Sequence, residues 1–155
     1  MKITYRKATT QDFESVLELI NELAIFENAG EQVSNTVERM KAEQDEFQCF
    51  VAETETKEII GIALTYIAYS TWVGRYLYLE DLIVKEKYRG NKVGGKLINE
   101  VFKLAQKENV ERVRWQVLDW NTNAIDFYKK INATIDKEWY NCDFNKTGIQ
   151  EFKFL

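Results

Sequence analysis

The spacing of apolar residues predicts alternating secondary structure in the first half of the chain. KITYRKA, at residues 2–8, alternates polar and apolar positions and is typical of a strand. Apolar residues from Phe13 to Ala24 recur at helical spacing, and the polar stretch Ser34–Gln44 predicts a shorter helix capped by Ser34 or Asn35. The polar turn TETKE joins two further predicted strands, Phe47–Glu53 and Ile59–Tyr69.

The second half continues the alternation. Tyr76–Val84 predicts a strand with acidic residues at its centre, and apolar residues between Leu97 and Ala105 mark a helix. The remaining predictions are strand Arg112–Leu118, helix Asn123–Lys130, and closing strands Thr134–Phe144 and Ile149–Leu155. This order predicts an α/β fold with a mixed sheet of about seven strands and helices on both faces. No repeat or linker interrupts the 155 residues, so we expect one domain, 1–155.

Charge and composition narrow the classes of partner. The net charge is −4 and the pI is about 5.1, which gives no electrostatic footprint for nucleic acid and favours small cationic partners. The start MKITYRKATTQ is too polar for a signal peptide, and no apolar run is long enough to cross a membrane. We therefore expect a cytoplasmic protein with no membrane partner.

The chain contains no histidine and two distant cysteines, Cys49 and Cys142. Histidine-based nucleophile pairs and histidine-ligated metals are thereby excluded, and the cysteine spacing indicates neither a zinc site nor a disulfide framework. Any catalysis must use carboxylates, tyrosines, lysines or backbone groups, and we expect no metal.

A glycine-rich turn, YRGNKVGGKLI at residues 88–98, allows two interpretations. Counted from Gly90 it is one residue short of a nucleotide-triphosphate loop, because Leu97 stands where a magnesium-binding Ser or Thr is required. Alternatively, turn amides at the start of a helix bind a pyrophosphate without magnesium. The spacing alone also fits an ordinary strand-to-helix turn with a solvated basic rim.

Two longer segments carry a resemblance to a known family. The run STWVGRYLYLEDLIVKEKYRGNKVGGKLI, followed by VLDWNTNAIDFYKKINA, resembles the GNAT family of N-acetyltransferases and, within it, the diamine (spermidine/spermine) acetyltransferase subgroup. The resemblance extends over nearly the whole chain. It implies the single-domain GNAT fold, acetyl-CoA as acetyl donor, a small-molecule amine as substrate, and a homodimer.

The resemblance also implies which residues contact the cofactor. The pyrophosphate turn corresponds to Arg89, Gly90, Asn91, Lys92, Val93, Gly94 and Gly95. Amides on a bulged or splayed strand, implied at Leu82, Ile83 and Val84, hold the acetyl carbonyl, and the coenzyme is further contacted by Asn121, Thr122, Asn123 and Ala124. The sequence departs from the family at Lys92, where a small residue is usual, and at Asn132, where glycine is usual. Asn tolerates a left-handed backbone, so the second turn can survive.

Two residues are implied to move protons. Deprotonating an alkylammonium at pH 7 costs on the order of 4.6 kcal/mol, and the resemblance selects Glu80 as the base. A carboxylate is a poor base for this step unless burial raises its pKa or water carries the proton onward. Because neighbouring residues of a regular strand face opposite sides, we expect only one of Glu80 and Asp81 to face a given pocket. Tyr128 matches the general acid that assists the leaving thiolate. Direct attack in a ternary complex needs no acyl-enzyme.

The implied amine site combines acids with aromatic rings, which suits a polyamine. Its residues are Phe26, Glu27, Trp72, Glu80 and Asp81, with Glu138 and Trp139 as a weaker match. Ser70 replaces one acid of the family's pocket, so a shorter diamine or a lysine-like amino acid such as thialysine is an alternative substrate. A non-catalytic acyl-CoA-binding protein and a triphosphate-binding protein are the alternatives from other classes.

Overall fold

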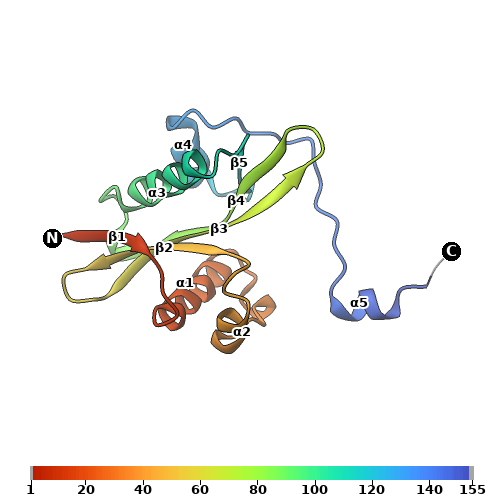
Figure 1. Cartoon of the computed structure of the whole chain (residues 1–155), viewed down its shortest axis with the longest axis horizontal. Helices are drawn as coiled ribbons and strands as arrows, with labels where there is room; N and C mark the ends of the chain where they lie inside the picture. Colours follow the sequence, from red (N-terminus) through yellow and green to blue (C-terminus); the bar gives the residue numbers. More distant parts are fainter. Residues whose placement is uncertain (1, 154–155) are drawn as a thin grey trace. The chain divides into compact units, whose positions relative to one another are not determined.

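The computed structural model describes residues 2–153. They form two compact units, divided between Leu118 and Asp119, and each unit is described by itself (Figure 1). In the described residues, no helix is both long and apolar enough to span a membrane.

The first unit is built on one mixed sheet. Its strands stand in sequence order, with antiparallel pairing from the first to the fourth and parallel pairing between the last two. They are β1 (Ile3–Lys7), β2 (Gln48–Thr54), β3 (Ile59–Ser70), β4 (Gly74–Val84) and β5 (Val113–Arg114). The predicted mixed sheet is confirmed, although the predicted strand Arg112–Leu118 is paired over only two residues.

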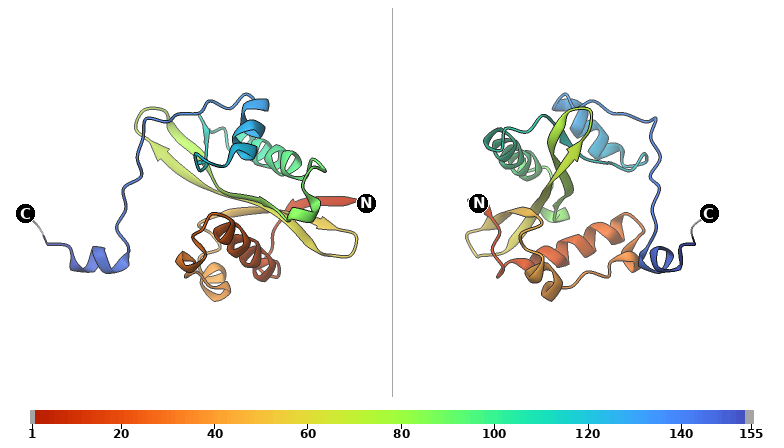
Figure 2. Two further views of the ribbon diagram at one scale, coloured as in Figure 1. Left: turned by 180° about the vertical axis from the view of Figure 1, so that it is seen from behind. Right: turned by 45° about the vertical axis from the view of Figure 1, so that its right-hand side comes forward.

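Helices cover both faces of this sheet, as predicted (Figure 2). The helical segments are α1 (Phe13–Phe26), η1 (Gly30–Gln32), α2 (Val37–Ala42), η2 (Glu86–Tyr88) and α3 (Val93–Lys107). One core cluster joins α1 and α2 to one face through Val16, Leu19 and Met40, and another joins α3 to the opposite face. The predicted cap of the second helix was wrong, because the hydroxyl of Thr36 accepts the hydrogen bond from the Arg39 amide (3.1 Å).

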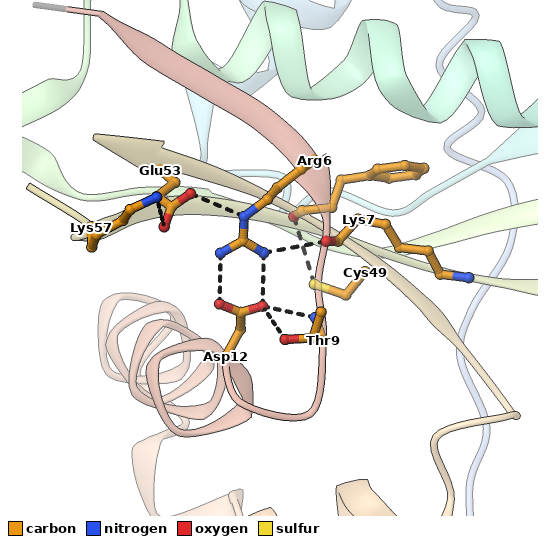
Figure 3. Close-up of polar contacts among 8 residues, drawn as sticks. Arg6, Lys7, Thr9, Asp12, Cys49, Glu53 and Lys57 are labelled. Carbon is orange, nitrogen blue, oxygen red and sulfur yellow. Dashed lines mark hydrogen bonds and ion pairs between the residues drawn. The ribbon is translucent and has the colours of Figure 1, made fainter. Parts of the chain in front are cut away.

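A carboxylate–guanidinium network fastens β1 to its neighbours (Figure 3). Arg6 donates two hydrogen bonds to Asp12, of 2.8 and 2.9 Å, and a third to Glu53 of β2 at 3.0 Å. Asp12 also accepts from the amide and the hydroxyl of Thr9 (2.7 and 3.0 Å). The Arg6 hydrogen bonds lower the pKa of Asp12 to about 2, so this carboxylate is ionised at neutral pH. The start of α1 is thereby held against the sheet.

A β-bulge interrupts the pairing of β3 with β4. Leu64 lies opposite Asp81 and Thr65 lies opposite Leu79, which leaves Glu80 as an extra residue on β4. The bulge that the family resemblance implied is therefore present. It lies two residues before the segment expected to hold the acetyl group.

The second unit contains helices α4 (Thr122–Lys130) and α5 (Lys146–Glu151). The prediction of about seven strands was wrong, because residues 134–144 form no strand in the described structure and the sheet has five. Within the predicted last strand, Ile149 lies in α5, whose start is capped by the Asn145 side chain accepting from the Gly148 amide (2.8 Å). Local capping therefore overrides the alternating apolar pattern there. Residues 154 and 155 of that predicted strand lie outside the described residues.

Gly61 on β3 lies close to the backbone of β4, and a substitution there tests how tightly the two strands pack. A methyl group at Gly61 would lie 2.9 Å from the carbonyl oxygen of Ile83, whereas one at Gly94 would meet only the Val84 side chain at 3.8 Å. We expect Gly61→Ala to lower the free energy of unfolding by about 1–3 kcal/mol through forced displacement of β4. The control Gly94→Ala, in a helix, should leave it unchanged or raise it by about 0.5–1 kcal/mol. Urea denaturation measures both, and equal stabilities would contradict this account of the close approach.

Candidate active site

One edge of β4 is open along its C-terminal half. β5 pairs with β4 only at Leu77 and Tyr78, and no other strand of the described first unit lies on that side. The Leu77 amide donates toward this side, to the carbonyl of Arg112 (2.9 Å). Beyond Tyr78 the backbone groups on this side of β4 therefore have no sheet partner.

The alternation of the backbone decides which amides point to the open edge. The Lys85 amide donates to the Ile60 carbonyl of β3 (2.9 Å), and N–H groups alternate between the two sides of a strand. Counted back from Lys85, the Ile83 amide faces β3, whereas the amides of Leu82 and Val84 face the open edge. Of the three amides implied by the family resemblance, two therefore face the open edge, and that of Ile83 faces into the sheet.

The glycine-rich turn leads directly from this edge into α3. The helix begins at Val93, so Val93, Gly94 and Gly95 form its first turn, where the backbone N–H groups lack intrahelical acceptors. Lys92 is the residue preceding the helix and has a left-handed backbone, with φ 62°. Gly90 also has positive φ, 79°. Successive N–H groups and the positive end of the helix dipole therefore converge on the turn, as an anion site requires.

The left-handed backbone at Lys92 explains why the family has a small residue there. A side chain at this conformation costs roughly 1 kcal/mol, which glycine avoids. The Lys92 side chain is exposed, and no ion pair found among residues 2–153 involves it. The exposed lysine thus adds a cation at the residue that directly precedes the first turn of α3.

Leu97 faces away from the turn. It is fully buried in the core cluster between α3 and the sheet. The position that a triphosphate loop needs for a metal-binding hydroxyl is therefore used for packing. Among the described residues, no group of acidic, cysteine or histidine side chains has the arrangement of a metal site.

Arg89 joins the turn to the end of α1. Its Nε donates to the Val84 carbonyl (3.0 Å), and its guanidinium carbon lies 5.7 Å from the ring centroid of Phe26. Phe26 was expected in the amine site and Arg89 in the cofactor site. The structure brings these two residues together at the open end of β4.

Glu80 and Asp81 lie on the same face of the sheet, contrary to the expectation for a regular strand. Leu79 and Leu82 both pack in the α3 core cluster, so the two acids between them share the opposite face, which α1 covers. The bulge at Glu80 is the physical reason, because an extra residue shifts the alternation of side chains. Glu80 is exposed and Asp81 is half-buried.

The surroundings of this acidic pair raise the pKa of Asp81 to about 6. Burial is the main cause, followed by repulsion from Glu80 and Glu27. Burial also raises the pKa of Glu27, which follows the last residue of α1. Cys49 is buried near Asp81, and desolvation raises the pKa of its thiol to about 12, so it is no nucleophile at neutral pH.

Two tyrosines extend this face and were not selected from the sequence. Tyr66 on β3 lies opposite Tyr78 on β4, with ring centroids 5.2 Å apart. Burial and the charge of Glu80 raise the pKa of both phenols, that of Tyr78 to about 12. The signal was present in YLYLE, where Tyr76, Tyr78 and Glu80 stand at alternate positions and therefore share a face.

Trp72 and Ser70 lie far from the acidic pair within the chain. Both belong to the β3–β4 hairpin tip, six residues of β3 beyond the Leu64–Asp81 pair, or roughly 20 Å along the strand. Trp72 is 82% exposed, and its amide donates to the Ser70 hydroxyl (3.2 Å). Trp72 is therefore not brought together with Glu27, Glu80 and Asp81.

The remaining predicted residues belong to the second unit. The Asn121 side chain caps α4 by accepting from the Ala124 amide (3.3 Å), and Thr122, Asn123 and Ala124 form the first turn of that helix. Tyr128 is buried, with its ring centroid 5.6 Å from that of Phe127.

The second unit also contains Asn132, expected in a left-handed turn, and the weaker amine-site match, Glu138 and Trp139. Asn132 has a left-handed backbone, φ 62°, which confirms that Asn serves where glycine was expected. Glu138 and Trp139 are exposed.

Comparisons with known proteins agree with this geometry. Residues 13–133 match the acetyltransferase (GNAT) family. The thialysine N-epsilon-acetyltransferase of Bos taurus is 36% identical, over 96% of each chain. The spermidine/spermine N(1)-acetyltransferase-like protein 1 of Homo sapiens is 26% identical, over 93% of this chain and 23% of that protein. The solved structure of an aminoglycoside acetyltransferase from an uncultured soil metagenomic sample superposes with a TM-score of 0.77 at 20% identity, covering 92% of this chain and 95% of that one. The chain belongs to the GNAT family of acetyltransferases.

Proposed function

We propose that the protein transfers the acetyl group of acetyl-CoA to a primary amine of a small lysine-like or diamine substrate. The observation that carries the proposal is the open edge of β4, which runs from the Glu80–Asp81 pair to the glycine-rich turn of α3. Along this edge the backbone amides of Leu82 and Val84 are followed by the first-turn amides of α3, which suit a phosphate. The carboxylates of Glu80 and Asp81 lie beside them and suit an ammonium group.

Acetyl-CoA fits the donor groups along this edge. The first-turn amides of α3 and the guanidinium of Arg89 are suited to the pyrophosphate, and the amides of Leu82 and Val84 to the acetyl carbonyl. Asn91 belongs to the same turn and donates to the Tyr88 carbonyl (3.2 Å), which stabilises it. Asn121, Thr122, Asn123 and Ala124 are the proposed further contacts of the coenzyme. The proposal needs no metal.

The acidic pair is proposed to accept the amine proton. Glu80 is the base implied by the family resemblance, and Asp81 beside it has the raised pKa that makes a carboxylate an effective acceptor. The deprotonated nitrogen attacks the acetyl carbonyl, the carbon–sulfur bond breaks, and the thiolate leaves. The high pKa of the Cys49 thiol favours direct transfer over an acyl-enzyme.

Tyr128 is proposed to donate a hydrogen bond or a proton to the leaving thiolate. A free phenol has a pKa of about 10 and a thiol one of about 8.5, so full transfer is uphill by on the order of 2 kcal/mol. Hydrogen bonding to the developing charge is therefore the main contribution. The support for this role is the matching DFYKK segment at the end of α4.

The substrate is proposed to be a lysine-like amino acid first and a diamine second. The 36% identity to a thialysine acetyltransferase over the full length supports this order. Glu27, Glu80 and Asp81 suit an ammonium group, while Phe26, Tyr66 and Tyr78 offer ring faces to methylene groups. Trp72, at the β3–β4 hairpin tip, lies too far from the acidic pair to contact the same amine and is left out of the proposed amine site. A protein with this site is expected to bind no nucleic acid and to work in the cytoplasm.

Thiol release from acetyl-CoA tests the reaction across thialysine, lysine, ornithine, short diamines and spermidine. We expect turnover with at least one of these amines, highest with the lysine-like ones. Tyr128→Phe should lower kcat on the order of 100-fold because the leaving thiolate loses its donor. Tyr69→Phe, at an exposed tyrosine of β3, is the matched control and should match the wild type. Absence of turnover with every amine would refute the transferase, and an unimpaired Tyr128→Phe would refute only the role of Tyr128.

The pH dependence of kcat/KM separates the two carboxylates. If Asp81 accepts the proton, kcat/KM should rise with pH through about 6, because the acceptor must be ionised. Glu80→Gln removes a negative neighbour, lowers the pKa of Asp81 and so shifts this rise to lower pH, while Asp81→Asn should abolish most activity. Loss of activity in Glu80→Gln with retention in Asp81→Asn would instead assign the base to Glu80. The titration of the substrate amine is the same in all variants and cancels in the comparison.

We also propose that residues 1–155 form one functional domain that pairs with a second copy. Support comes from large apolar side chains exposed along the second unit, including Trp139 (70%), Tyr140 (94%) and Phe144 (66%). Sedimentation velocity should give twice the 18.3 kDa chain mass, and the Trp139→Glu/Tyr140→Glu variant should be monomeric. Phe102→Glu on α3 is the control and should remain a dimer. A wild-type monomer at micromolar concentration would contradict the proposal.

A further inference from the structure

Glu58, between β2 and β3, gathers three side chains from the segment that precedes the glycine-rich turn. Its carboxylate accepts hydrogen bonds from the Tyr88 hydroxyl (2.8 Å) and the Lys85 ammonium (3.1 Å), and it pairs with the Lys87 ammonium (3.1 Å). The Tyr88 hydrogen bond is the main cause that lowers the pKa of Glu58 to about 2, followed by the bonds from Lys85 and Lys87. Lys85, Lys87 and Tyr88 lie in the run that carries the family resemblance, whereas Glu58 lies outside it and was not selected from the sequence.

The three partners of Glu58 make up nearly all of the link between β4 and Arg89. Lys85 follows the last residue of β4, and Lys87 and Tyr88 lie in η2. The backbone of this link is fixed at its start by the Lys85 amide donating to Ile60, and within η2 by the Tyr88 amide donating to Lys85 (2.9 Å each). Glu58 supplies the side-chain attachment, so the link is fastened to β3 by its backbone and to the β2–β3 turn by its side chains.

The direction of this link sets where the phosphate-binding amides point. Arg89 follows Tyr88 directly, and its Nε returns to the carbonyl of Val84 at the end of β4. Asn91 donates to the Tyr88 carbonyl (3.2 Å), so a shift of Tyr88 is transmitted to the next turn. The cluster also offsets charge, because residues 85–92 carry four cations and one acid. Two of those cations are paired with Glu58.

We propose that Glu58 is a positioning residue for coenzyme A: its carboxylate holds the Lys85–Tyr88 link in the conformation that presents the Arg89–Gly95 turn to the pyrophosphate. This inference rests on the proposed function in that coenzyme A is the ligand of the turn. Glu58 acts through Tyr88 and the two lysines and makes no contact with the reacting atoms.

Binding of coenzyme A to Glu58→Gln, measured by calorimetry, is the direct test. Glutamine keeps the shape and one oxygen acceptor but loses the charge. Because charge-assisted hydrogen bonds are lost, we expect the Kd for coenzyme A and the KM for acetyl-CoA to rise roughly tenfold, with kcat changed less than twofold. Glu55→Gln is the matched control, since Glu55 is an exposed acid of the same turn. It should bind coenzyme A like the wild type.

A second variant keeps the test valid if Glu58→Gln folds poorly. Tyr88→Phe removes only the 2.8 Å hydrogen bond and should weaken binding in the same direction. If the two residues act through one contact, the double variant should lose less than the sum of the single losses.

Three outcomes would overturn the proposal. In the first, Glu58→Gln binds coenzyme A as tightly as the wild type or tighter, because the freed lysines bind phosphate. In the second, the melting temperature falls while the Kd is unchanged, which indicates a purely structural role. In the third, the wild-type protein does not bind coenzyme A at all. A wild type that binds coenzyme A yet acetylates no amine would contradict the proposed reaction and leave the positioning role intact.

Discussion

The extra residue in β4 at Glu80 is the constraint on which the candidate site depends. By shifting the alternation of the strand, it directs the amides of Leu82 and Val84 to the open edge and keeps that of Ile83 in the sheet. The same shift places Asp81 beside Glu80 on the face covered by α1. One inserted residue thus sets both the direction of the amides proposed to bind the acyl group and the pairing of the carboxylates.

The two ends of this edge have opposite charge requirements, one for the proposed phosphate ligand and one for the proposed amine. The turn before α3 needs positive charge and free amides, and it gathers Arg89 and Lys92 where a helix dipole begins. The proposed amine face needs carboxylates, and there the pKa of Asp81 is raised first by burial and then by the nearby charges of Glu80 and Glu27. Phe26 directly precedes Glu27 in the chain, and its ring lies 5.7 Å from the guanidinium of Arg89.

The sequence predicted most of the first unit because local patterns and tertiary packing agree there. Leu97, for example, belongs to the apolar face that predicted the helix, and it is fully buried in the structure. The number of strands was overestimated where the alternating apolar pattern was the only evidence for a strand. Ile149, for example, fits such a pattern, but it lies in the short helix α5, whose start is capped by the Asn145 side chain. The shared face of Glu80 and Asp81 could not be predicted from alternation, since a bulge leaves no signal in the pattern it interrupts.

Lys92 is a residue whose backbone conformation does not match its intrinsic preference. Its left-handed backbone favours glycine, and a lysine there carries a conformational cost of roughly 1 kcal/mol. Lys92 stands between a link in which Lys85, Lys87 and Tyr88 are all bound to Glu58 and the first turn of α3, which begins one residue later. Contacts on both sides of this residue therefore favour a single backbone path through the turn. A cradle for pyrophosphate needs its backbone fixed before the ligand arrives, and the proposed role of Glu58 is to supply that rigidity from the turn before β3.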